Sequence, residues 1–181
     1  MKKVPVIAGI TFVILLCLFA FFRYTAKSYS PEGNVEFTDG NLKVYVFYNR
    51  PSKKGREIFG KLVPYGRTWR TGANEPTTFE TNKDLKFGDK ELKAGKYSLW
   101  TVPGQQTWQV IFNSGIPWWG VSFNKEANRE IVDDALIIEV PAVIENKEFE
   151  QFTISVEKVS EGSELILIWD KTLVAVPFSV K

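Results

Sequence analysis

Histidine is absent from this chain of 181 residues, and cysteine occurs once, at Cys17. Without an imidazole there is no Ser–His–Asp triad, no Cys–His dyad, no histidine-ligated metal and no histidine pH switch. A single thiol excludes an intramolecular disulfide and a cysteine zinc cluster. Most hydrolase and metalloenzyme classes are therefore excluded, and the sequence predicts neither a metal site nor a cofactor.

Basic charge is also too sparse to suggest a nucleic-acid partner. The chain has 23 Lys and Arg against 21 Asp and Glu, and residues 1–23 hold three of the basic residues and no acidic one. The remainder is close to neutral, whereas nucleic-acid binding needs a clustered basic face. Neither GxGxxG nor a P-loop pattern occurs, so a nucleotide cradle has no sequence support.

An uncharged and almost wholly apolar run lies at the N-terminus, over residues 4–22, and about 20 apolar residues are needed to cross a bilayer. We interpret residues 1–23 as an uncleaved transmembrane anchor, since no good A-x-A-like cleavage site follows. Two alternatives stay open, a cleaved signal peptide and lipidation of Cys17. Leu16 before that cysteine and the sequence LFAFF after it disfavour lipidation.

Positive charge at the extreme N-terminus predicts the orientation. Lys2 and Lys3 precede the apolar run, and Arg23 and Lys27 follow it. The short N-terminal tail carries slightly more positive charge, so it should stay cytoplasmic. The rest of the chain would then face outward, into a bacterial periplasm or an equivalent space. Residues 24–34, polar and with Pro31 and Gly33, are predicted to be a linker.

Residues 35–181 carry the signals of an antiparallel β domain. Runs rich in β-branched and aromatic residues occupy 42–49, 96–102, 107–113 and 135–140, and the second and third are close enough for a hairpin. Residues 151–180 predict a three-strand meander with turns at 161–163 and 170–171, in which the apolar run 164–169 is buried on both faces. Asn124 caps a short predicted helix over 124–132. We therefore expect an all-β fold, an antiparallel β-sandwich or flattened barrel of about eight strands.

One loop segment is denser in special residues than a sandwich requires. Arginine offers a planar fork of donors for carboxylates, phosphates or sugar hydroxyls, and tryptophan adds a flat apolar face. The segment predicts a binding site for a polar ligand, a glycan or a peptide; the alternative is a loop brace held by ion pairs. The candidate residues are Arg50, Arg56, Trp69, Arg70, Asn74 and Glu75.

This segment also carries a family resemblance. The chain reads YNRPSKKGREIFGKLVPYGRTWRTGANEPTTF from Tyr48, and later LKAGKYSLWTVPGQQTWQVIFN. These strings resemble the DUF2911 family of bacterial proteins over about residues 35–181, most strongly over 48–113; Lys96 stands where that family prefers Thr. The resemblance implies an exported β domain of the cell envelope in Bacteroidota-type bacteria, and it implies no activity and no catalytic residue.

Trp118 and Trp119 form a second aromatic candidate. Neighbouring residues of an extended chain point to opposite faces, so both cannot enter one core. One of them is a candidate ligand platform or membrane-surface contact, and the alternative places one in the core and one on a loop rim.

Three functions stay open at this point. The first is a membrane-anchored, non-catalytic module that binds a polar ligand, and the second is an accessory subunit of a larger envelope complex. The third is a hydrolase without histidine, in which Glu75 would pair with Asp84 or Asp89 as glycosidase carboxylates do. The missing chemistry makes an enzyme the least favoured of the three.

Overall fold

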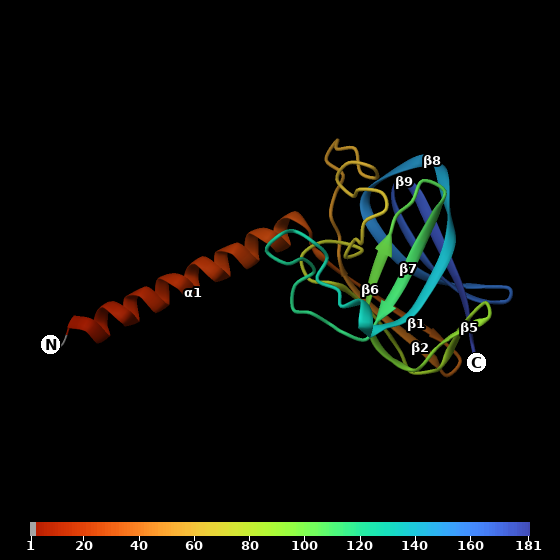
Figure 1. Ribbon diagram of the computed structural model, residues 1–181, viewed down its shortest axis with the longest axis horizontal. Helices are drawn as coiled ribbons and strands as arrows, with labels where there is room; N and C mark the ends of the chain where they lie inside the picture. Colours follow the sequence, from red (N-terminus) through yellow and green to blue (C-terminus); the bar gives the residue numbers. More distant parts are fainter. Residues whose placement is uncertain (1–2) are drawn as a thin grey trace.

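The computed structural model describes residues 3–181 of the chain. One helix, α1 (Lys3–Tyr29), projects from a β domain, as Figure 1 shows. Its segment Ile7–Tyr29, with a mean hydropathy of 2.2, is long and apolar enough to be a membrane anchor or a signal sequence. Lys2, which the orientation prediction uses, lies outside the described residues.

Nine antiparallel strands form the domain, which confirms the predicted all-β, sandwich-like fold. The sheet order is β1-β2-β3-β6-β7-β8-β9-β4-β5. The strands are β1 (Glu32–Asp39), β2 (Leu42–Asn49), β3 (Thr77–Thr81), β4 (Leu85–Phe87), β5 (Lys90–Leu92), β6 (Gly95–Val102), β7 (Thr107–Asn113), β8 (Asp134–Val159) and β9 (Gly162–Val180).

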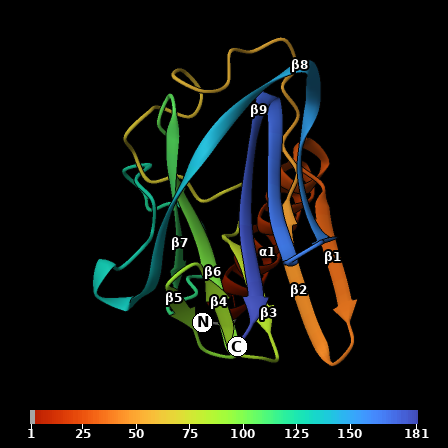
Figure 2. The same ribbon diagram turned by 90° about the vertical axis from the view of Figure 1, so that its right-hand side faces the viewer.

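Two long strands curl this sheet around a core. The first part of β8 pairs with β7, and both β8 and β9 bend across the domain, so that β9 ends against β4 (Figure 2). Aromatic rings from facing parts of the sheet meet inside: Phe79 lies 6.3 Å from Phe178, and Phe87 lies 5.2 Å from Phe112, between ring centroids. Burial of such large apolar side chains is the main driving force of the fold.

The predicted meander of residues 151–180 is wrong in its connectivity. Asp170 does not begin a tight turn but lies inside β9, opposite Phe149 and with φ of 55°, where the register shifts. Its carboxylate binds the Nζ of Lys53 at 2.7 Å. The strand therefore bends at Asp170 instead of reversing. Within β9, Leu165 and Leu167 are buried while Ile166 is half-buried, so residues 164–169 bury one face and not two.

The predicted helix over residues 124–132 is also wrong. The side chain of Asn124 accepts a hydrogen bond from the backbone N–H of Glu126 at 3.2 Å, and Lys125 has a φ of 66°. That left-handed residue interrupts any helix. Only a 3₁₀ turn at Ile131–Asp133 forms.

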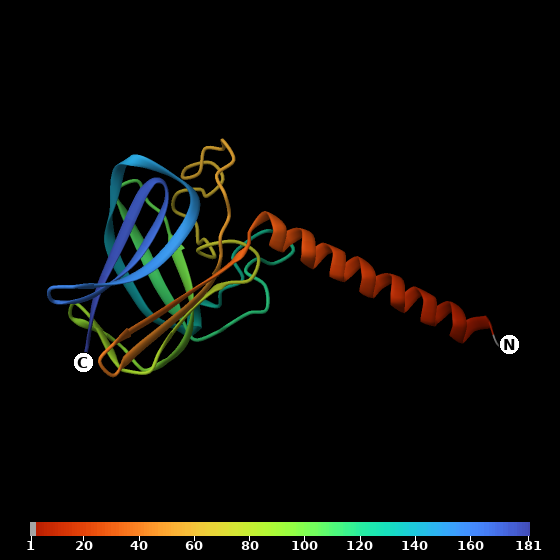
Figure 3. The same ribbon diagram turned by 180° about the vertical axis from the view of Figure 1, so that it is seen from behind.

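Residues expected to be a linker are structured instead. Helix α1 continues to Tyr29, and β1 starts at Glu32 and pairs with β2 along its whole length. Helix α1 thus enters the β domain with almost no free chain between them (Figure 3). Two long loops, 50–76 and 114–133, gather at this same end of the domain (Figures 1 and 3).

Candidate functional site

The loop of residues 50–76 is fastened to the core by its own apolar side chains. Ile58, Phe59 and Val63 are buried, and Phe59 and Val63 pair through a short backbone bridge. A second bridge joins Trp69 to Thr101 of β6. Although it has almost no regular secondary structure, the loop therefore has a fixed path across the end of the sheet.

Trp69 belongs to an aromatic cluster, which we define as Phe59, Trp69, Trp108, Phe152 and Trp169. Its ring stacks on Trp169 at 5.9 Å and 18°, and it lies 5.1 Å from Phe152. The indole Nε1–H donates to the carbonyl of Gly72 at 3.1 Å. Trp69 is thus a structural anchor of the loop, although one part of it stays open to the cavity described below.

A tight turn follows this anchor. Gly72 has a φ of 149°, and a Cβ at this position would lie 2.8 Å from the carbonyl oxygen of Asn49. The Thr77 hydroxyl donates to the carbonyl of Thr71 at 2.6 Å and closes the turn. Only glycine fits at this close approach, and the turn fixes the direction in which Asn74 and Glu75 leave it.

Asn74 and Glu75 hold the end of α1. Glu75 binds Lys27 Nζ at 2.6 Å and Arg23 at 2.9 Å, and the Asn74 amide donates to the carbonyl of Ala26 at 3.3 Å. Burial alone would raise the pKa of Glu75, but the hydrogen bond from Lys27 and the charge of Arg23 together lower it. Glu75 is therefore an ionised brace between helix and domain.

The three arginines of the predicted site have different surroundings. The Nη2 of Arg50 donates to Thr153 at 3.3 Å, and Arg56 donates to the carbonyls of Lys53 and Ser52, both in its own loop. Arg70 differs in that no hydrogen bond or ion pair of its side chain is found in the described part of the chain. Its Nε, like that of Arg50, is buried without a hydrogen-bond partner. Burial lowers the pKa of Arg70 below its usual value.

A cavity of about 1260 Å³ lies between the two loops and the end of α1. Arg56, Trp69, Arg70 and Asn74 line it, whereas Arg50 and Glu75 do not. The structure thus brings four of the six predicted residues to one space. Such a volume is large enough for a small polar ligand.

The opposite wall of this cavity had not been predicted from the sequence. Residues of the second loop, among them Lys125, Glu126 and Arg129, line it together with Tyr29 of α1. Arg129 is held by a bidentate ion pair with Asp134, both almost fully buried, which fixes the loop to β8. The run NKEANRE resembled a helix, and no pattern in it indicated that these residues line a cavity. No group of three or more metal-ligating side chains occurs among residues 3–181.

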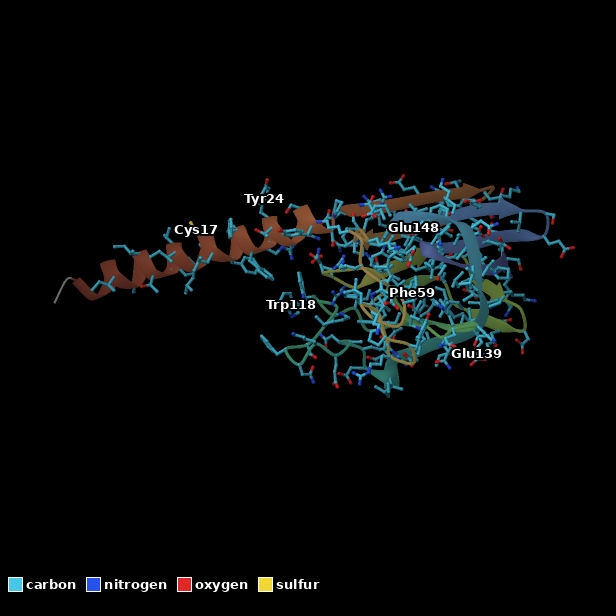
Figure 4. The ribbon with its side chains drawn as sticks, turned by 90° about the horizontal axis from the view of Figure 1, so that it is seen from above. Cys17, Tyr24, Phe59, Trp118, Glu139 and Glu148 are labelled. Atoms are coloured by element: carbon cyan, nitrogen blue, oxygen red, sulfur yellow. The ribbon has the colours of Figure 1, made fainter. Side chains whose placement is uncertain are left out.

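Trp118 and Trp119 lie outside the core. Trp118 is 73% exposed, and Figure 4 places it on the side of the domain that faces the helix. The ring of Trp119 lies 6.1 Å from Phe22 of α1. In the same view Cys17 lies far along the projecting helix, away from the cavity.

Comparison with protein-family models matches residues 30–178 to the family described as "Protein of unknown function (DUF2911)". The chain belongs to the DUF2911 family. No match was found among curated proteins or among solved structures. The DUF2911 match contains all nine strands except the end of β9, and both loops of the cavity, whereas α1 (Lys3–Tyr29) precedes it. The cavity wall supplied by α1 thus lies outside the matched residues.

Proposed function

We propose that this protein is a membrane-anchored, outward-facing and non-catalytic module that binds a polar ligand, a glycan or a peptide, in the cavity at the end of α1. The observation that carries this proposal is the cavity itself, since the half-buried side chains of Trp69 and Arg70 both line it and Arg70 has no counterion within residues 3–181. An apolar wall with a few convergent polar groups is typical of ligand sites.

A binding role accounts for these groups better than a hydrolytic one. The candidate acid, Glu75, is bound to Lys27 and Arg23 and does not line the cavity. A general acid needs a raised pKa, and that of Glu75 is lowered. We therefore place Glu75 in the attachment of the anchor.

The test fills the cavity without removing any of its contacts. Full-length protein in mild detergent is titrated calorimetrically with a panel of oligosaccharides and short peptides. The variant Ala127→Trp places an indole on the cavity wall, and the control Ala135→Trp places one on exposed strand β8. We expect Ala127→Trp to lower affinity at least tenfold and the control to bind like the parent. Equal binding by both variants would locate the ligand elsewhere, and a panel without any binder would contradict the proposal.

An accessory subunit of a larger envelope complex is the second candidate. Exposed apolar side chains favour it: Trp118, Phe123, Ile131 and Val132 all lie on the 114–133 loop. Clustered apolar exposure of this kind is common at protein contacts. Mild extraction from the native membrane, followed by native mass spectrometry, separates the two: a large co-purifying assembly favours the subunit, and a lone chain favours the binding module.

A further inference from the structure

Charge on the cavity wall is strongly one-sided. Six cationic side chains line the cavity and one acidic side chain does, and the six are Lys54, Arg56, Arg67, Arg70, Lys125 and Arg129. The acidic one, Glu126, is exposed and accepts a hydrogen bond from Asn124 at 3.0 Å. The chain outside its first 23 residues is nearly neutral, so this concentration of positive charge is local.

Only part of this positive charge is neutralised within the fold. Arg129 is paired with Asp134, and Lys54 lies over the ring of Tyr29 at 4.5 Å from its centroid. No ion pair within residues 3–181 involves Arg67, Arg70 or Lys125. The cavity thus has several positive charges without a protein counterion.

Arg70 is the decisive residue among these. Exposed cations such as Arg67 and Lys125 are hydrated by bulk water, whereas the Arg70 Nε is shielded from solvent and has no partner. The backbone of Gly120 confines the side chain, since a Cβ there would lie 2.5 Å from Cδ of Arg70. Arg70 as a whole is half-buried and has no counterion within residues 3–181, so an anion bound to its guanidinium would supply the missing charge partner. The planar fork of arginine matches carboxylate and phosphate oxygens.

We propose that the ligand of this cavity is an anion bearing a phosphate or a carboxylate, bound by Arg70, with Arg67 and Lys125 at the rim. This inference rests on the proposed binding function and narrows its ligand class. Residues Ala26, Tyr29 and Ser30, at the end of α1, line the same cavity. If α1 spans the bilayer, the site lies beside the membrane surface, where both lipid headgroups and soluble anions reach it.

Two arms of one experiment separate these sources. In the first, full-length protein in neutral detergent is titrated with glycerol 3-phosphate. In the second, the protein is placed in nanodiscs of phosphatidylcholine with or without phosphatidylglycerol, and retained lipid is counted by native mass spectrometry. Binding in the first arm alone identifies a soluble anion, and selective retention of phosphatidylglycerol identifies a headgroup.

The variants are Arg70→Gln, Arg70→Lys and the control Lys171→Gln, which removes a positive charge from an exposed position of β9. We expect Arg70→Gln to weaken anion binding at least tenfold, as loss of a charge-assisted hydrogen bond does. Arg70→Lys should recover only part of the affinity because it lacks the fork. Lys171→Gln should bind like the parent, and added salt should weaken binding.

Neutral probes run in parallel, maltotriose and a capped neutral tripeptide, distinguish the two levels of the proposal. One outcome overturns the anion inference but keeps the binding function. In that outcome no anion binds, whereas a neutral probe does, and binding of the neutral probe is blocked by Ala127→Trp and unchanged by Arg70→Gln. If neither anions nor neutral probes bind, both are overturned. Circular dichroism of each variant establishes that the domain is folded.

Discussion

Replacing Trp69 by alanine tests whether the aromatic cluster fastens the 50–76 loop to the core. The indole lies within 6.3 Å, between ring centroids, of four other rings, and it donates one hydrogen bond to Gly72. Truncation of a core tryptophan costs about 3–5 kcal/mol, which includes the lost packing and the cavity left behind. Because Trp69 is half-buried, we expect the lower end, about 3 kcal/mol.

For a domain of this size, about 3 kcal/mol corresponds to a fall in Tm of about 6–12 °C. The measurement is thermal and urea unfolding of the full-length protein in mild detergent, monitored through its near-ultraviolet circular dichroism. Trp118→Ala is the matched control, since it removes the same side chain from an exposed position and should change stability by less than about 0.5 kcal/mol. If the Trp69 and Trp118 variants unfold at the same midpoint, the aromatic cluster does not hold the loop and our reasoning is refuted.

Two further predictions concern ion pairs. Arg129→Met leaves Asp134, whose side chain is 8% exposed, without a counterion, and should lower the free energy of unfolding in urea by about 3–5 kcal/mol. The double variant with Asp134→Asn should recover most of this loss, and no recovery would contradict the ion pair as its cause. The pKa of Glu75 is lower in the folded protein than in the unfolded chain. The contribution of its carboxylate to the stability of the fold is therefore complete above about pH 4.3 and is lost as pH falls through the folded pKa. The Tm difference between parent and Glu75→Gln should therefore shrink on acidification, and a difference that grows would refute this assignment.

Local patterns predicted much of the fold. Alternating burial over residues 152–157 of β8 follows the alternation of apolar and polar residues there, and the hairpin of β6 and β7 forms where two β-rich runs flank Pro103 and Gly104. Strand β1 was not predicted because its sequence EGNVEFTD is polar and buries few side chains. The strand forms because its backbone groups make hydrogen bonds to β2. The bend at Asp170 likewise depends on Lys53 and Phe149, far away in the sequence.

Prediction of the site was less complete for the same reason. The sequence marked the segment that contains Arg70 and Glu75, yet these residues, five apart, have opposite roles: one lines the cavity and the other binds α1. Their roles depend on partners from distant segments, and short-range periodicity contains no information on such partners. The same limit hid the wall of residues 121–131.

By itself the sequence determined the absence of histidine chemistry, the apolar N-terminal helix, the β character of the domain and its resemblance to DUF2911 proteins. All of these are properties of composition or of neighbouring residues. Only the tertiary structure decided that the helix end, the 50–76 loop and the 114–133 loop enclose one cavity with Arg70 unpaired inside it. That arrangement comes from contacts between residues about 50 to 100 positions apart, which form when the sheet closes around its core.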